Sequence, residues 1–324
     1  MMLLGVSIIV SFCGTFYLSR LFSRSNLLRN AAGMPLSGGM AVGLVVSAAG
    51  ALLAAVYPSA SSFYKAFIPA ALLILASGLW DDVCELAVTG KIITQVAATA
   101  LLVLLGVRTR IVFLNEPLNI IITFAWVLFI TNSFNLLDIM DGLCASVTGI
   151  IASGLLIVCL LNGDIGSARL IGIIAGSAAG FLVLNRPEAS IYLGNSGSHF
   201  LGFVLAAVSI ELSYASASRQ AALISPVFIM GFPIFDTFFV AVMRMANGRS
   251  AVRKSKDHLV LRFLALGHSK RRALIFMSSL AFLFTACGVV MSCVPNSIGA
   301  GVIIFVMFVS FIVWRAMSRV RING

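Results

Sequence analysis

The chain has 324 residues, of which 60% are hydrophobic and 10% are charged. Soluble domains carry about 25% charged residues and roughly 45–50% apolar ones, so this composition excludes a soluble fold. The 22 Lys and Arg outnumber the 11 Asp and Glu. In a membrane protein this surplus indicates cytoplasmic loops, and we expect no nucleic-acid partner. The six cysteines form no CxxC pair, so we expect no metal thiolate site.

Apolar runs recur along the whole chain, and a helix needs about 20 mainly apolar residues to cross a bilayer. We therefore predict an all-α polytopic membrane protein with about 11 transmembrane helices, forming a single domain over residues 1–324. The predicted spans cover residues 2–19, 39–57, 63–79, 91–107, 118–136, 143–161, 166–184, 199–214, 222–243, 273–293 and 298–314.

The distribution of charge predicts the orientation. If the amino terminus lies outside, 17 of the 22 basic residues fall in cytoplasmic segments, which is the arrangement that membrane proteins favour. The carboxyl terminus is then cytoplasmic, and so are the loops at about 20–38, 80–90, 137–142, 185–198 and 244–272. Eight of the eleven acidic residues fall on this same face. Because ionisable residues near lipid are costly, this concentration indicates a functional site.

Two adjacent carboxylates, Asp81 and Asp82, end the third predicted span in the motif GLWDDV. Neighbouring side chains on a helix point about 100° apart, so one can face a ligand while the other meets a basic group. Two like charges this close also separate their proton affinities, which can leave one carboxylate as a base. The alternative is a solvated helix end.

The motif NSFNLLDIMDGL follows the fifth predicted span. It spaces Asn132, Asn135, Asp138 and Asp141 by three residues, which on a helix makes one stripe. Amide and carboxylate oxygens are the ligands that Mg²⁺ prefers. The alternative is a hydrogen-bonded polar seam between membrane helices.

A third cluster runs from Asn185 to Phe203, between the seventh and eighth predicted spans. Gly194 and Gly197 let backbone N–H groups approach an anion at the start of a helix, where phosphate binds readily. Tyr192 offers an aromatic face on which a base could stack. Alone, a Gly-Ser turn before a helix is weak evidence of a phosphate site and is more often a simple loop.

The fourth cluster is the basic loop 244–272. His258 and Arg262 are four residues apart and share a face if this segment is helical, which suits a diphosphate. Asp236 in FPIFDTF lies deeper in the membrane and is either functional or the partner of a basic residue. The alternative for the loop is ordinary cytoplasmic positive charge.

These motifs occur in a fixed order with PLSGG (residues 35–39), Lys91, PIFDT (233–237) and DHLVLRF (257–263). In this order the sequence resembles the polyprenyl-phosphate N-acetylhexosamine-1-phosphate transferases over nearly the whole chain. The resemblance implies transfer of a sugar 1-phosphate from a UDP-sugar to polyprenyl (undecaprenyl) phosphate, with Mg²⁺ or alternatively Mn²⁺ and release of UMP. It also implies the bacterial inner (plasma) membrane, with the active site on the cytoplasmic face. A homodimer is left open.

The resemblance further implies roles for single residues. Asp81 or Asp82 would accept or orient the proton of the lipid phosphate, with Asp138 as a further catalytic carboxylate, and Lys91 would offset phosphate charge. Asn135 and Asn195 would hold the metal. The remaining predicted substrate contacts are Asn132, Asp141, Asn185, Tyr192, His258 and Arg262.

The sequence departs from the family pattern at two places. The family usually has Asp where this chain has Asn195, so we expect weaker metal affinity. The usual H-x-H-H cluster of the last loop is reduced to His258, with Val260 and Leu261 in the other positions. These departures keep open a non-catalytic membrane scaffold derived from the family. A secondary transporter is a further alternative, but it would need ionisable groups near the middle of the bilayer.

Overall fold

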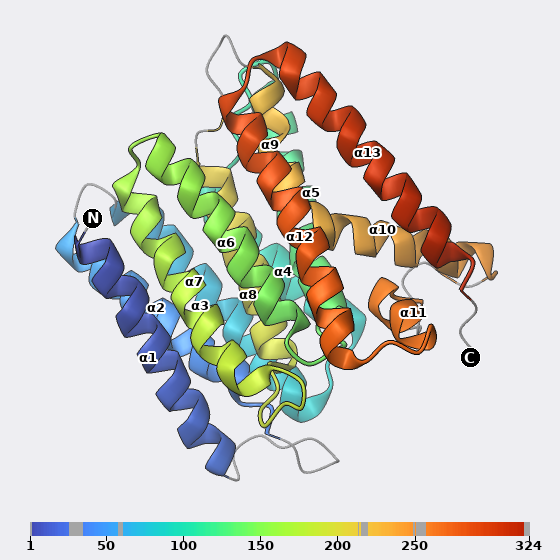
Figure 1. Ribbon diagram of the computed structural model, residues 1–324. Helices are drawn as coiled ribbons and strands as arrows, with labels where there is room; N and C mark the ends of the chain where they lie inside the picture. Colours follow the sequence, from blue (N-terminus) through green and yellow to red (C-terminus); the bar gives the residue numbers. More distant parts are fainter. Residues whose placement is uncertain are drawn as a thin grey trace. The chain divides into compact units, whose positions relative to one another are not determined.

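The computed structural model describes residues 2–25, 35–57, 61–212, 214, 220–248, 250 and 257–320 (Figure 1). Over these residues the secondary structure is helical, apart from one bridge residue at Pro35. The chain divides into two compact units, Met1–Ser213 and Tyr214–Gly324. The prediction of one domain over both units stays a prediction.

The first unit contains eight of the described helices. They are α1 (Met2–Arg24), α2 (Gly38–Val56), α3 (Ser61–Cys84), α4 (Val88–Leu104), α5 (Glu116–Leu137), α6 (Leu143–Leu161), α7 (Ile165–Asn185) and α8 (Gly194–Glu211). Each coincides with a predicted apolar run, because helices are the only open-ended elements that satisfy their own backbone in lipid.

Helix α8 organises this unit, because it packs on both α3 and α5. Ser198 in its first turns donates its hydroxyl to the side-chain Oδ1 of Asn135 at 3.1 Å, near the end of α5. Near the other end of α8, Ser209 accepts from the Trp126 indole N–H at 3.0 Å. Helix α8 therefore runs antiparallel to α5 along its length. Since α3 and α5 both finish at the start of α8, α4 has to carry the chain back between them.

The second unit contains η2 (Gln220–Ile224), α9 (Ser225–Ile229), α10 (Gly231–Ala246), α11 (Leu259–Ala265), α12 (Lys270–Cys293) and α13 (Asn296–Ser318). The prediction of one span over 222–243 stays a prediction, and the segment bends by 70° between α9 and α10. Pro226 and Pro233 lack the N–H groups that would continue a straight helix. At the bend, Gly231 packs so closely on Phe284 that a Cβ would not fit.

Eight of the described helices are long and apolar enough to cross a membrane, or nine if the bent pair counts as one span. These eight are α1, α2, α3, α5, α6, α7, α12 and α13. Helix α4 is shorter, at 17 residues, and α8 begins with the polar sequence GNSGSH. The all-α polytopic membrane class is confirmed, whereas the count of 11 spans and the orientation stay predictions.

Candidate functional site

The two adjacent carboxylates at the end of α3 point to different partners. Asp81 is buried, and its Oδ2 lies 2.6 Å from the Lys91 ammonium at the start of α4. Its Oδ1 accepts the backbone N–H of Leu86 at 2.6 Å. Asp82 instead faces the start of α8, where Oδ1 accepts from Asn195 N at 2.7 Å and Oδ2 from Ser196 N at 3.1 Å. The negative charge of Asp81 is thus balanced within the chain, while Asp82 is held by helix-end amides.

This geometry changes the prediction for the Gly-Ser turn. We expected its backbone N–H groups to bind a phosphate, but those of Asn195 and Ser196 already bind the Asp82 carboxylate. A carboxylate at a helix amino terminus satisfies the free N–H groups and the positive end of the helix dipole. Gly194 has φ +72°, and a Cβ there would lie 2.7 Å from Asp82 Oδ2. The turn therefore needs glycine in order to receive the carboxylate.

The PLSGG motif fixes the segment that leads into α8. Tyr192 donates its backbone N–H to Pro35 O at 2.9 Å, and Gly38 donates to Tyr192 O at 3.1 Å. Gly39 donates to Leu193 O at 2.9 Å, and it lies too close to Gly197 N for a side chain to fit. Residues about 150 positions apart in the sequence are thereby joined by backbone contacts beside Asp82.

The four residues spaced by three do not form one helical stripe. Helix α5 ends at Leu137, and Asp138 has ψ 48°, so the chain leaves the helix before Asp141. Asn132 and Asn135 do lie on α5. The Asn132 amide donates to Gln95 Oε1 of α4 at 2.7 Å, while Asn135 Oδ1 accepts from Ser198 of α8.

Asn185 connects the two loops at this end of the unit. Its Oδ1 accepts the backbone N–H of Gly142 at 3.0 Å, and its Nδ2 donates to Ile191 O at 2.8 Å. The side chain is buried, so these bonds give it a structural role in holding the 138–142 turn against the segment before α8. Its predicted contact with the substrate stays a prediction, as do those of Asp141 and Tyr192.

Asp138 interacts electrostatically with two other carboxylates, Asp82 and Asp141, at this end of the unit. Asp138 lies just outside α5 and is half-buried. Burial raises the pKa of Asp138 to about 7, and the negative charges of Asp82 and Asp141 add to the shift. Lys91 already balances Asp81, so the negative charges that act on Asp138 are those of Asp82 and Asp141. A divalent cation would reduce the repulsion that Asp138 experiences.

The donor set suits Mg²⁺ better than it suits a metal that needs a closed protein cage. The described residues hold no group of three or more His, Cys, Asp or Glu arranged for a metal. Asn135 contributes an amide oxygen next to Ser198, and Asn195 follows the glycine that receives Asp82. Mg²⁺ commonly takes one or two carboxylates and completes its shell with water and substrate phosphates, so these oxygens fit it.

Sequence reasoning missed two polar residues near Lys91. His199 is buried on α8, and its Nε2 has no hydrogen-bond partner among the residues that the structure describes. Gln95 pairs with Asn132 and lies one helical turn after Lys91. Both line a small cavity, together with Ile74, Ser77, Lys91 and Thr94. Gln95 interrupts an apolar run, and that is the signal that could have identified it, whereas His199 ends the polar sequence GNSGSH.

The last two predicted substrate contacts lie in the second unit. His258 Nδ1 is 3.2 Å from Asp236 Oδ2, while Asp236 Oδ1 accepts from Leu259 N at 3.1 Å. Asp236 therefore holds the start of α11. The Arg262 guanidinium donates to Asp257 Oδ1 at 2.9 Å and to Val320 O at 2.6 Å. Arg262 thus binds backbone carbonyl groups at the carboxyl end of α13, where a cation is favourable. Substrate contacts by His258 and Arg262 stay predictions.

Comparisons with known proteins identify the family. Residues 64–213 match glycosyl transferase family 4, a region that contains the carboxylates, Lys91 and the start of α8. A decaprenyl-phosphate N-acetylglucosaminephosphotransferase of Mycobacterium leprae is 34% identical over 75% of this chain and 69% of its own. The chain belongs to glycosyl transferase family 4. The resemblance predicted from its motifs is therefore confirmed.

Other members of glycosyl transferase family 4 are also similar along much of their length. A probable undecaprenyl-phosphate N-acetylglucosaminyl 1-phosphate transferase of Bacillus subtilis is 28% identical over 89% of this chain and 80% of its own. An undecaprenyl-phosphate alpha-N-acetylglucosaminyl 1-phosphate transferase of Thermotoga maritima is 28% identical over 70% and 69%. Family membership and the apolar helices together identify an integral membrane transferase.

Proposed function

We propose that this family 4 transferase moves N-acetylglucosamine 1-phosphate from UDP-N-acetylglucosamine to a polyprenyl phosphate. A phosphate oxygen of the lipid attacks the β-phosphorus of the nucleotide sugar and forms a new P–O bond. The bond from that phosphorus to the bridging oxygen breaks, and UMP leaves with the oxygen. The product is a polyprenyl diphospho-sugar, which starts a lipid-linked envelope glycan. The choice of sugar and lipid rests on the names of the relatives.

The observation that carries the proposal is the meeting of Asp82, Asp138 and Lys91 at one end of the first unit. In phosphoryl transfer the protein does little covalent chemistry, and it acts mainly by positioning the substrates and neutralising their charge. Asp82 is held in place by two amides and would take or orient the proton of the lipid phosphate. Lys91 lies 2.6 Å from Asp81 and remains partly exposed, so it can also meet a phosphate oxygen.

We propose Mg²⁺ as the cofactor, with Mn²⁺ as a substitute. Asn135 and Asn195 would hold it through amide oxygens, with Asp82 and Asp138 supplying negative charge nearby. When bound, the ion neutralises the diphosphate and favours departure of UMP. Because Asn195 is neutral where the family has a carboxylate, we expect this protein to need more Mg²⁺ than a relative with Asp.

For the topology we propose 11 spans, the amino terminus outside and the site on the cytoplasmic face of the inner membrane. Two contacts support counting α4 and α8 as spans. Helix α8 meets α5 near both of its ends, through Asn135 and Trp126, and α4 returns the chain between α3 and α5. The bent α9 and α10 pair completes the count.

The decisive experiment measures UMP release from radiolabelled UDP-N-acetylglucosamine by purified protein with undecaprenyl phosphate and Mg²⁺. Asp82→Asn should lower the rate by about 10²–10⁴-fold, which is the usual contribution of a positioned acid or base. Asp164→Asn is the matched control, because it makes the same chemical change at the N-cap of α7, at the opposite end of the unit. Asn caps a helix as well as Asp does, so this variant should keep wild-type activity.

The same assay tests the alternatives. If the wild-type protein releases no UMP from any of a panel of UDP-sugars, under conditions where a relative is active, the scaffold hypothesis replaces the enzyme. If Asp82→Asn and Asp164→Asn lose activity equally, the acidic end of the unit is not the site.

A further inference from the structure

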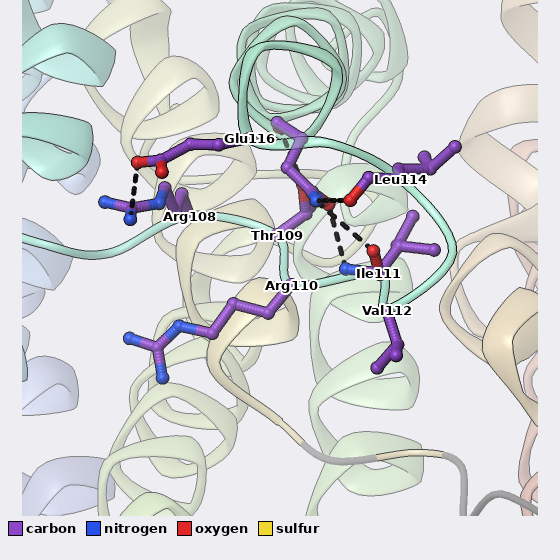
Figure 2. Close-up of a pocket in the computed structure, with 8 residues that line it drawn as sticks. Arg108, Thr109, Arg110, Ile111, Val112, Leu114 and Glu116 are labelled. Atoms are coloured by element: carbon purple, nitrogen blue, oxygen red, sulfur yellow. Dashed lines mark hydrogen bonds and ion pairs between the residues drawn. The ribbon is translucent and has the colours of Figure 1, made fainter.

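A second polar site lies at the opposite end of α5 from Asp138. The loop between α4 and α5 folds around a cavity of about 320 Å³, which Figure 2 shows from close by. The cavity is lined by Arg108, Thr109, Arg110, Ile111, Val112, Leu114, Glu116 and Asn119. Helix α5 has 22 residues and is about 33 Å long at 1.5 Å per residue, so this site and the carboxylates lie a bilayer's thickness apart.

Asn119 and the threonines hold this loop in one conformation. The buried Asn119 side chain accepts from Ile111 N at 2.8 Å and donates to the carbonyls of Ile111 and Leu114, each at 3.3 Å. Thr109 donates its backbone N–H to Thr123 Oγ1 at 2.9 Å. The cavity is therefore built by side chains that satisfy the loop backbone, and it does not depend on a ligand to form.

Two arginines and two apolar side chains project from this frame. Arg108 is 2.7 Å from Glu116, and Arg110 donates to Gly106 O at 3.1 Å and also interacts with the charge of Glu211. These contacts do not use all five N–H donors of either guanidinium. Both side chains extend to the same side of the loop in Figure 2. Val112 and Phe113 follow Arg110 in this loop, and they are 91% and 68% exposed, although contact with water is unfavourable for both side chains.

We propose that this loop binds the phosphate headgroup of an anionic glycerophospholipid in the leaflet opposite the carboxylates. Arg108 and Arg110 contact the phosphate, and Val112 and Phe113 enter the acyl region beside it. Arginine forks match phosphate oxygens, and the loop places them at a helix end, where headgroups lie. Apolar and aromatic side chains anchor at this depth in the membrane. A soluble phosphate would use the arginines but leave the two exposed apolar residues without a partner.

The proposal is tested by lipid binding, independently of transferase activity. Purified protein is titrated with phosphatidylglycerol in detergent, and native mass spectrometry counts the bound lipid. Each cation near a membrane surface contributes about 1 kcal/mol, which is about fivefold in affinity, so Arg110→Gln should weaken binding about fivefold. Arg108→Gln,Arg110→Gln should weaken it further, and Phe113→Ser should weaken it without changing charge. Lys65→Gln, at the same end of the unit, is the matched control and should bind as wild type does.

Several outcomes would overturn the proposal. If wild type and the double arginine variant bind phosphatidylglycerol equally well, the loop is not the binding site. The same conclusion follows if Lys65→Gln weakens phosphatidylglycerol binding as much as the arginine variants do. If phosphatidylglycerol and phosphatidylcholine bind equally well, the site does not select an anionic headgroup. Displacement of the lipid by millimolar glycerol 3-phosphate assigns the site to a soluble phosphate. If the double variant unfolds, Arg110→Gln and Phe113→Ser decide, because both side chains are exposed.

Discussion

At the scale of single residues, the neighbours of Asp138 make its ionisation costly. Burial and the charges of Asp82 and Asp141 raise its pKa to about 7, from 3.8 in an unfolded chain. A raised carboxyl pKa stabilises the fold at pH values below 3.8, and this contribution is lost as the pH rises through about 7. Without Mg²⁺, the fold should therefore lose about 2–3 kcal/mol of stability between pH 5 and pH 8 through this one group.

Asp138→Asn should remove that loss, since the amide does not titrate. The measurement is the midpoint of thermal unfolding in detergent with EDTA, followed from pH 5 to pH 8. The wild-type midpoint should fall more steeply than that of the variant between pH 5 and pH 7, and the two curves should run parallel above about pH 7.5. Curves that are parallel over the whole range from pH 5 to pH 8 would mean that Asp138 is ionised at no cost and that the three carboxylates do not repel one another.

The residues of the site show where sequence reasoning stops. Neighbouring side chains on a helix point about 100° apart, so the sequence predicted that one carboxylate of the DD motif would meet a basic residue. Asp81 has that partner in Lys91. The amide partners of Asp82 could not be predicted, because they depend on where α8 begins relative to α3. Asn185 shows the same limit, and so does the bond from Arg262 to Val320 O, since these bonds are to backbone groups that no sequence motif specifies.

At the scale of helices, the contact between α3 and α8 sets the position of Asp82. Gly78 on α3 packs directly against the backbone of Ser196, and a Cβ would meet the Ser196 Cα and lie 2.9 Å from its N. Backbone atoms cannot turn aside as a flexible side chain can. Gly78→Ala should therefore push the helices apart and destabilise the protein by about 1–3 kcal/mol, the usual cost of overpacking.

Gly149→Ala is the control for this prediction. Gly149 lies inside α6, and a Cβ there would meet nothing within 4 Å. Alanine favours a helix over glycine by up to about 1 kcal/mol, so this variant should be as stable as wild type or more so. Thermal unfolding of both variants and UMP release by both provide the readouts. A Gly78→Ala protein with wild-type stability and activity would show that α3 and α8 have room to adjust.

Helix positions were the most predictable part of the fold, because the bilayer fixes the length and polarity of each span. The break between α9 and α10 was not predicted. Residues 222–243 have the composition of a span, and prolines occur in membrane helices that stay continuous. At the bend Gly231 packs against Phe284, which lies more than 50 residues further along the chain, so this contact could not be predicted from the local sequence.

At the scale of the whole molecule, the bent pair decides the topology of everything after it. If α9 and α10 together cross the membrane, α12 ends outside and α13 ends in the cytoplasm. If the pair enters and returns on one side, both directions reverse. Charge favours a crossing, because Arg315 and Arg319 at the end of α13 then lie in the cytoplasm.

Two native cysteines distinguish these topologies. Cys84 and Cys293 are both exposed, at the ends of α3 and α12. In variants that keep one of them and replace the other five cysteines by alanine, a membrane-impermeant maleimide is applied to intact cells and then to opened cells. Cys293 should react in intact cells and Cys84 only in opened ones. If Cys293 also reacts only in opened cells, the bent pair does not cross the membrane. If Cys84 reacts in intact cells, the carboxylates face outward and cannot meet a cytoplasmic nucleotide sugar.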